Sequence, residues 1–302
     1  MKQFLITMFL MCVSCVNAQL VPSQRHWQKG VKELRVISYN ICDGFNGDQG
    51  FETERQEKLA EWVKQHNPDV VALQELVGFN QQKLAALAKR WGHPYAAILK
   101  ENGYPVGITS TEPIQVKNRI TANIGHGLLH AVTHNIDFLV THLNPGNTRK
   151  RNTEAHIIVK YINDNKLSSC LLMGDMNSHS PFDGDLMEEE AYLLKNRYSE
   201  ENLLNKEFDY SVISTFLSYP LIDVCRKFTE KDERISFPTA LNMTQSENDR
   251  VRFRGGERID FIFATPDLAE KAVDGFIWNS ESEKYLSDHY PIGIDLLFYP
   301  QK

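Results

Sequence analysis

The chain has 302 residues, of which 42% are hydrophobic, and a formal net charge of −6. This length and composition provide a sizeable core, enough for one large domain or two small ones, and they exclude wholesale disorder. Proteins that bind nucleic acid usually carry a basic face. The sequence lacks a long basic run from which to build one, so its composition does not favour DNA or RNA as the main partner, although a local basic patch would fit.

The N-terminus has the pattern of a signal peptide, residues 1–18. Lys2 supplies a positive charge, residues 4–16 are apolar, and Val16-Asn17-Ala18 places small residues where signal peptidase cleaves. We therefore expect a mature chain that begins near Gln19 and is secreted or periplasmic. A lipoprotein anchored through Cys15 is the alternative. The apolar run is too short to span a membrane comfortably, and no other stretch of the sequence is long enough.

Strand and helix patterns alternate through the sequence after a polar leader, residues 19–33. The expected strands cover residues 34–39, 70–73, 95–99, 106–109, 128–133, 136–141, 170–173, 259–263 and 292–298. The expected helices cover residues 51–66, 81–91, 152–163 and 188–210. His134-Asn135 separates two of the strands and predicts a hairpin. We expect one monomeric α/β domain over residues 34–302, built on two sheets.

Polar side chains stand where expected strands from both halves end. They are Asn40, Glu75, His142, Asp175, Asn177, Asp260, Asp288 and His289. Asp175 and Asn177 follow the apolar strand 170–173 and Gly174 with one residue between them, so both can point the same way from the strand end. The alternative for this stretch is an ordinary Asp/Asn-rich turn. Because several strands end in this way, the pattern favours a functional site at the edge of a sheet.

The residue types limit the chemistry of such a site. Oxygen ligands without thiolate favour a hard cation, Mg²⁺, Mn²⁺ or Ca²⁺. The cysteines beyond the signal peptide, Cys42, Cys170 and Cys225, are too widely spaced for zinc or a disulfide framework. Two histidines suit a general acid or base, or an electrostatic partner for an anion. Motifs for a serine nucleophile, a dinucleotide or a Walker loop are absent from the sequence. These features indicate attack of water on a phosphoester.

At these residues the sequence resembles the endonuclease/exonuclease/phosphatase superfamily, which has the DNase I-like fold. The matching segments, in the family's order, are Ile37-Ser38-Tyr39-Asn40, 69–75 (DVVALQE), Thr141-His142-Leu143, Gly174-Asp175-Met176-Asn177, 258–262 (RIDFI) and Ser287-Asp288-His289. Together they extend over nearly the whole mature chain. The resemblance implies an α/β four-layer sandwich, in which two packed mixed β-sheets are flanked by helices and the site lies at one edge.

The resemblance also implies a divalent metal ion and an activated water. Glu75 resembles the family's main metal ligand, and Asn40 and Asp288 would lie close to the same ion. Asp175 resembles the aspartate that orients or deprotonates the attacking water, and Asn177 would hold a phosphate oxygen.

The histidines divide into those with motif support and those without. By the resemblance, His289 would contact the scissile phosphate while Asp260 holds its imidazole in the useful tautomer, and His142 would assist the phosphate or the leaving group. The residues alone leave open a surface salt bridge between Asp260 and Arg258, and a purely structural His142. We expect the histidines without motif support to be solvated or in the core: His126, His130, His134, His156 and His179.

Three functions compete. The first is a secreted metal-dependent phosphodiesterase or phosphatase that acts on a small or lipid-borne phosphate, such as a sphingomyelinase-like enzyme. The second is a secreted nuclease of the same fold, and the third is a binding module that has lost the chemistry. The third is disfavoured because every catalytic position holds the expected residue type. Export and acidity favour the first over the second. The short basic run 149–151 is expected to be a solvated helix start, though it could meet an anionic substrate.

Overall fold

The computed structural model describes residues 31–45, 52–186, 202–243 and 256–298. The predicted signal peptide and most of the leader lie outside the described residues. The first sheet has the strand order β13-β14-β1-β2-β4-β3 and the second the order β11-β12-β8-β7-β6-β5. Strands of the first sheet are β1 (Lys32–Asn40), β2 (Val70–Gln74), β3 (Tyr95–Ile98), β4 (Gly107–Ser110), β13 (Ala272–Ile277) and β14 (Ile292–Phe298). Strands of the second are β5 (Gln115–Ile120), β6 (Leu128–Thr133), β7 (Ile136–His142), β8 (Cys170–Asp175), β11 (Ile222–Asp223) and β12 (Asp260–Ala264).

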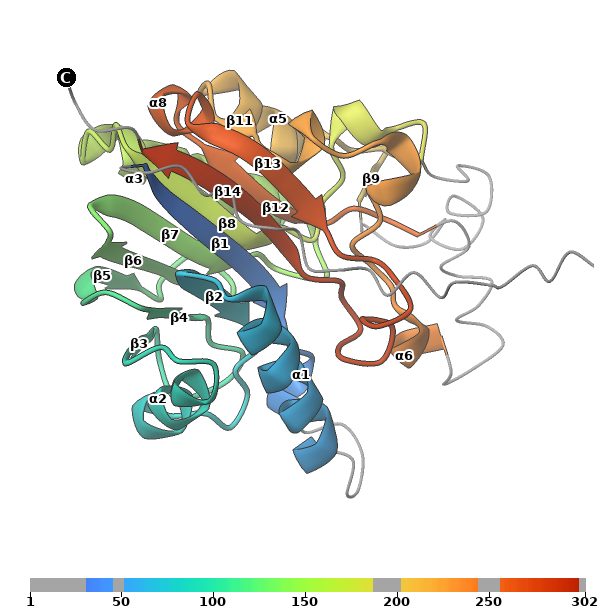
Figure 1. Ribbon diagram of the computed structural model, residues 1–302. Helices are drawn as coiled ribbons and strands as arrows, with labels where there is room; N and C mark the ends of the chain where they lie inside the picture. Colours follow the sequence, from blue (N-terminus) through green and yellow to red (C-terminus); the bar gives the residue numbers. More distant parts are fainter. Residues whose placement is uncertain (1–30, 46–51, 187–201, 244–255, 299–302) are drawn as a thin grey trace, which may run out of the picture.

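Helices cover the outer faces of both sheets, so the predicted four-layer α/β sandwich is confirmed (Figure 1). The α-helices of the described residues are α1 (Glu52–His66), α2 (Gln81–Arg90), α3 (Thr148–Asp164), α5 (Ser211–Ser218), α6 (Ala240–Met243) and α8 (Pro266–Ala269). Each sheet is mixed, because β1 pairs in parallel with β2, and β7 with β8, whereas the other pairs are antiparallel. Within the described ranges, no helix is both long and apolar enough to cross a membrane.

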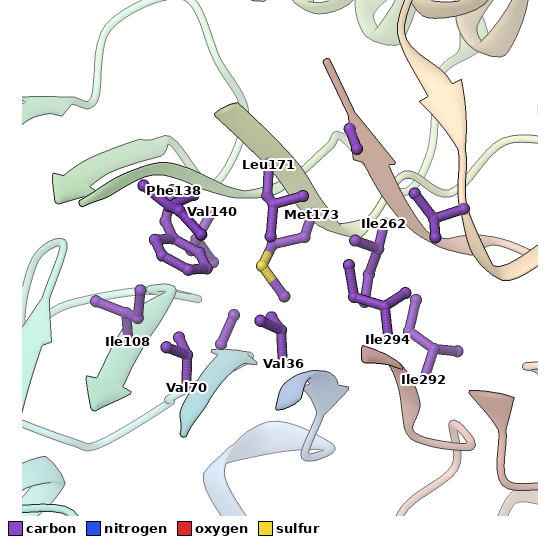
Figure 2. Close-up of a cluster of buried hydrophobic side chains, with 14 of the residues drawn as sticks. Val36, Val70, Ile108, Phe138, Val140, Leu171, Met173, Ile262, Ile292 and Ile294 are labelled. Carbon is purple, nitrogen blue, oxygen red and sulfur yellow. The ribbon is translucent and has the colours of Figure 1, made fainter. Parts of the chain in front are cut away.

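The central strands are apolar on both faces because each lies between two layers of core. On β1, Val36 faces the core between the sheets, and Ile37 faces the core under α1 and α2. On β8, Met173 faces the first of these cores, and Leu172 faces a third core under α3 and α5. Figure 2 shows the core between the sheets, where Val36 and Met173 approach each other with Ile262 and Ile294 beside them. This two-sided burial anchors the strand ends at which the polar residues stand.

Several elements differ from the sequence-based expectation. The helix expected at 152–163 begins at Thr148, because the Asn147 side chain accepts a hydrogen bond from the Lys150 N–H and caps it. The helix expected at 188–210 is wrong where the structure describes it, because residues 202–208 carry the short strands β9 (Leu203–Leu204) and β10 (Glu207–Phe208); residues 187–201 lie outside the described ranges. Strands β5, β11 and β13 and helices α5, α6 and α8 were not expected.

Candidate active site

The strand registers bring the predicted polar residues to one edge of the two sheets. Asn40 ends β1, and Glu75 directly follows its parallel neighbour β2. His142 and Asp175 are paired at the ends of parallel β7 and β8, and Asp260 at the start of β12 pairs with Asp175 from the other side. The sheets meet at this edge, where the Asn40 Nδ2 atom donates to Asp175 Oδ2 at 3.1 Å.

His289 lies between two buried carboxylates. Its Nδ1 atom is 2.8 Å from Asp260 Oδ2, and its Nε2 atom is 3.6 Å from Asp175 Oδ2. Burial alone would lower the pKa of His289, but the charges of Asp260 and Asp175 raise it well above the usual value, so the ring is an imidazolium at neutral pH. The alternative salt bridge between Asp260 and Arg258 is wrong, because the Arg258 guanidinium binds two other buried aspartates.

Hydrogen-bond donors surround the carboxylate of Asp175. Its Oδ1 atom accepts the backbone N–H of Asn177 at 2.8 Å, while its Oδ2 atom accepts from Asn40 and lies 3.4 Å from His142 Nε2. Burial raises the pKa of Asp175 to about 6, although the positive charge of His289 opposes this shift. A carboxylate with a pKa so close to neutral can exchange a proton with water at physiological pH.

The backbone adopts unusual conformations at the strand ends that carry these groups. Glu75 has φ 59° and Asn177 has φ 47°, both in the left-handed region that residues other than glycine seldom adopt. Gly174 has φ 138°, and a Cβ atom there would lie 1.9 Å from the Thr141 carbonyl oxygen. Only glycine therefore fits between β7 and β8 at this point. A strained residue costs about 1–3 kcal/mol, and such residues cluster at functional sites.

The predicted metal ligands provide two carboxylates of different character. Burial alone would raise the pKa of Glu75. The nearby His142 ring, the Asp43 N–H (2.8 Å from Oε2) and His289 outweigh burial and lower this pKa overall, so Glu75 is ionised. Burial raises the pKa of Asp288, and the negative charge of Glu75 adds to the shift against the opposing charge of His289. Neighbouring carboxylates that repel each other suit a divalent cation, so the residues present fit the expected ion.

Asn40 connects Glu75 to Asp175. Its Nδ2 atom donates to Glu75 Oε1 at 3.2 Å as well as to Asp175, while its amide oxygen accepts the Cys42 N–H at 3.1 Å. The role of Asn40 as a metal ligand stays a prediction.

A second possible metal site is formed by Asp175, Asp260 and His289, because one ligand atom of each lies within 4.8 Å of the others. We place the cation beside Glu75 instead, because each ring nitrogen of His289 already faces a carboxylate, Nδ1 at 2.8 Å from Asp260 and Nε2 at 3.6 Å from Asp175.

His142 is buried, but one of its two ring nitrogens lacks a hydrogen bond within the described part of the chain. Its Nδ1 atom has no hydrogen-bond partner among the described residues, which argues against a purely structural histidine. Burial lowers the pKa of His142, although the charge of Glu75 opposes the shift, so the ring is neutral at pH 7 and can donate one hydrogen bond and accept another.

His126 and Tyr104 border the site, and the sequence did not indicate either. The His126 ring lies 4.4 Å from the His142 ring and 5.1 Å from that of Tyr104, centroid to centroid. Burial lowers the pKa of His126 to about 4. The only signal in the sequence was a polar residue between Gly125 and Gly127 directly before a strand.

His130 and His179 were expected to be solvated or in the core, and they are buried with carboxylate partners.

Comparisons with known proteins agree with this geometry. A profile of the Endonuclease/Exonuclease/phosphatase family matches residues 37–289, which include every predicted site residue. An uncharacterised protein of Caenorhabditis elegans is 31% identical over 86 residues, which are 28% of this chain and only 25% of the worm protein. This match therefore spans a quarter of that relative's length.

Solved structures share the fold at low sequence identity. An AP endonuclease from Archaeoglobus fulgidus has a TM-score of 0.65 and 20% identity, covering 89% of this chain and 100% of that one. A 3′ phosphatase from Neisseria, bound to a product DNA hairpin, has a TM-score of 0.65 and 17% identity over 87% of this chain and 99% of that one. A 3′-5′ exonuclease from Neisseria meningitidis has a TM-score of 0.64 and 16% identity with the same coverage.

Proposed function

Because this chain belongs to the endonuclease/exonuclease/phosphatase family and is therefore a phosphoester hydrolase, we propose that it is an exported, metal-dependent phosphodiesterase that acts on a small or lipid-borne phosphate. One observation supports the chemistry: the buried row Asp260–His289–Asp175, in which the His289 imidazolium lies between two carboxylates at the end of the sheets. The arrangement suits an anionic substrate and a water that must lose a proton.

In the proposed reaction, Asp175 accepts the proton of the attacking water. Its carboxylate is held by the Asn177 N–H and by Asn40, which leaves lone pairs free for that water. Asp260 holds His289 as an imidazolium, whose Nε2–H stabilises the negative charge that develops on the phosphoryl oxygens.

The remaining groups orient the substrate. Neutral His142 donates to, or accepts from, the phosphate or the leaving oxygen, and the Asn177 side chain contacts a phosphate oxygen. A divalent cation, with Mg²⁺ favoured and Mn²⁺ or Ca²⁺ as alternatives, would be held by Glu75 and Asp288 and would polarise the phosphoryl group.

Two candidate functions differ in the class of substrate. The net charge of −6 and the N-terminal export pattern support a small or lipid-borne phosphoester. The second candidate is a secreted nuclease, which is favoured by solved neighbours that include an AP endonuclease and a 3′-5′ exonuclease.

A substrate panel separates the two candidates. Purified residues 19–302 with Mg²⁺ are incubated with sphingomyelin, inositol and sugar phosphodiesters, bis(p-nitrophenyl) phosphate, p-nitrophenyl phosphate, RNA, and DNA with and without abasic sites. We expect the highest kcat/KM on a lipid or small-molecule phosphodiester. A kcat/KM for DNA or RNA that exceeds all others would replace this assignment with the nuclease, and higher turnover of monoesters than of diesters would reject a phosphodiesterase.

A further inference from the structure

The start of α3 carries two buried charged side chains of opposite sign. Arg151 is 0% exposed and Glu154 is 4% exposed. A buried guanidinium or carboxylate is costly unless its hydrogen-bonding atoms find partners, so the partners of these side chains indicate their role.

Arg151 joins two loops that leave the second sheet at the site. Its nitrogen atoms donate to Ser178 Oγ (2.9 Å), to the carbonyl oxygens of Asn144 (2.8 Å) and Pro145 (3.2 Å), and to Asn202 Oδ1 (2.7 Å). Ser178 directly follows Asn177, and Asn144 lies two residues beyond His142. One guanidinium therefore fixes the chain just beyond two predicted site residues.

Glu154 joins one of these loops to a third. Its Oε2 atom accepts the Asn144 N–H and its Oε1 atom the Gly125 N–H, both at 2.9 Å. The two loops are packed so tightly that a Cβ atom on Gly125 would lie 3.2 Å from the Asn144 Cα atom. Gly125 precedes His126, whose ring lies against that of His142. The carboxylate therefore sets the spacing between the loop that carries His126 and the loop that directly follows His142.

We propose that Arg151 and Glu154 are positioning residues of the active site, which hold His126, His142 and Asn177 in register through the loops after β5, β7 and β8. A direct link supports the coupling of two of these loops, because Asn177 Nδ2 donates to the Leu143 carbonyl oxygen at 3.1 Å. In this proposal both side chains act through the loops and not on the substrate. The inference rests on the proposed function, since a rate effect requires phosphoester chemistry at this site.

Two conservative variants test the proposal. Glu154→Gln replaces one acceptor oxygen with an amino group at nearly constant volume, and Arg151→Lys keeps the charge but loses the planar fork. We expect kcat to fall about 10- to 100-fold in each variant with KM within about threefold, because a shift of about 1 Å in groups that act in the transition state has effects of that size.

Arg35→Lys is the matched control. Arg35 is 1% exposed and binds Asp295 through a fork at 2.8 and 2.6 Å, but it lies five residues before Asn40 on β1, about 16 Å along the strand. This variant loses the same kind of buried fork and should keep the wild-type kcat per folded molecule. The folded fraction is taken from thermal unfolding followed by circular dichroism.

Histidine NMR provides a readout that does not depend on activity. The imidazole resonances of His126 and His142 should shift in Glu154→Gln and Arg151→Lys, while those of His93, which is buried against Thr109, should not. Unmoved His126 and His142 resonances, or a fall in kcat no larger than in Arg35→Lys, would overturn the proposal. If the wild-type protein hydrolyses no phosphoester, the proposed function fails, and the resonances alone still decide whether these residues position the loops.

Discussion

Asp260→Asn should abolish most of the activity while leaving the fold intact. The carboxylate oxygen and His289 Nδ1 are 2.8 Å apart and buried. At an effective dielectric constant of about 20, two unit charges at that distance attract each other by about 6 kcal/mol, and desolvation offsets several kcal/mol of this. Asparagine keeps the shape and a hydrogen-bond acceptor but removes the charge that keeps the ring protonated.

The expected loss follows from the role of the imidazolium. A preorganised donor at a developing oxyanion contributes about 3–4 kcal/mol, so kcat should fall about 100- to 1,000-fold in Asp260→Asn and in His289→Ala. The double variant should be little worse than either single one, because the two residues act as a unit. The assay is steady-state hydrolysis of the best substrate, with circular dichroism to confirm folding.

Asp137→Asn provides a matched control for the Asp260 variant. Asp137 Oδ1 lies 2.7 Å from His130 Nε2, but this second His–Asp pair is at the opposite end of β7 from His142. The kcat of Asp137→Asn should stay at the wild-type value. Near wild-type hydrolysis by His289→Ala, or single losses that simply multiply in the double variant, would refute the coupling of Asp260 to His289.

The remaining predictions concern the metal, the proton and the N-terminus. Glu75→Gln should lose both Mg²⁺ affinity and turnover, because a hard cation needs a charged oxygen ligand; an unchanged Mg²⁺ titration by calorimetry would remove Glu75 from the ligand set. Because the pKa of Asp175 is about 6 and its ionised form accepts the proton, kcat/KM should fall as the pH drops below about 6; a pH profile that stays flat down to pH 4 would exclude Asp175 as the base. Protein from the native host should begin near Gln19, and N-terminal sequencing that finds Met1 retained would contradict export.

The sequence predicted the parts of the molecule in which local pattern and tertiary position agree. Strands β1 and β8 lie between two cores. Strand β8 was recognised as a short buried apolar run, and β1 from the alternation of apolar and polar residues around Val36 and Ile37. The polar residues that follow these strands were read from the same strand ends, and the strand registers bring them to one edge of the sheets. Their catalytic roles stay predictions.

Other elements have no such signal. Strand β5 has a mostly exposed, polar sequence at the sheet edge, and β13 is interrupted by a register shift between Ala272 and Asp274. The basic run 149–151 was expected to be a solvated helix start, because short runs of like charge usually face water. The helix begins at Thr148 behind the Asn147 cap, and Arg151 on its first turn is buried by hydrogen bonds to loop residues far along the chain, which the local pattern does not show.

The contact between His126 and His142 depends on long-range packing. The two residues are 16 positions apart, with His126 in the loop before β6 and His142 at the end of β7, and Glu154 from α3 joins the loop of His126 to the loop after His142. Periodicity and spacing describe one element at a time, so they cannot indicate a contact that three elements make together.

Hydrolysis of bis(p-nitrophenyl) phosphate tests the central claim most directly. Purified residues 19–302 are assayed with Mg²⁺, with EDTA, and as the His289→Ala variant, with release of p-nitrophenol followed by absorbance. We expect turnover with Mg²⁺ that EDTA abolishes and that falls at least about 100-fold in His289→Ala. Turnover that is equal in all three samples would contradict a metal-dependent phosphodiesterase centred on the Asp260–His289–Asp175 row.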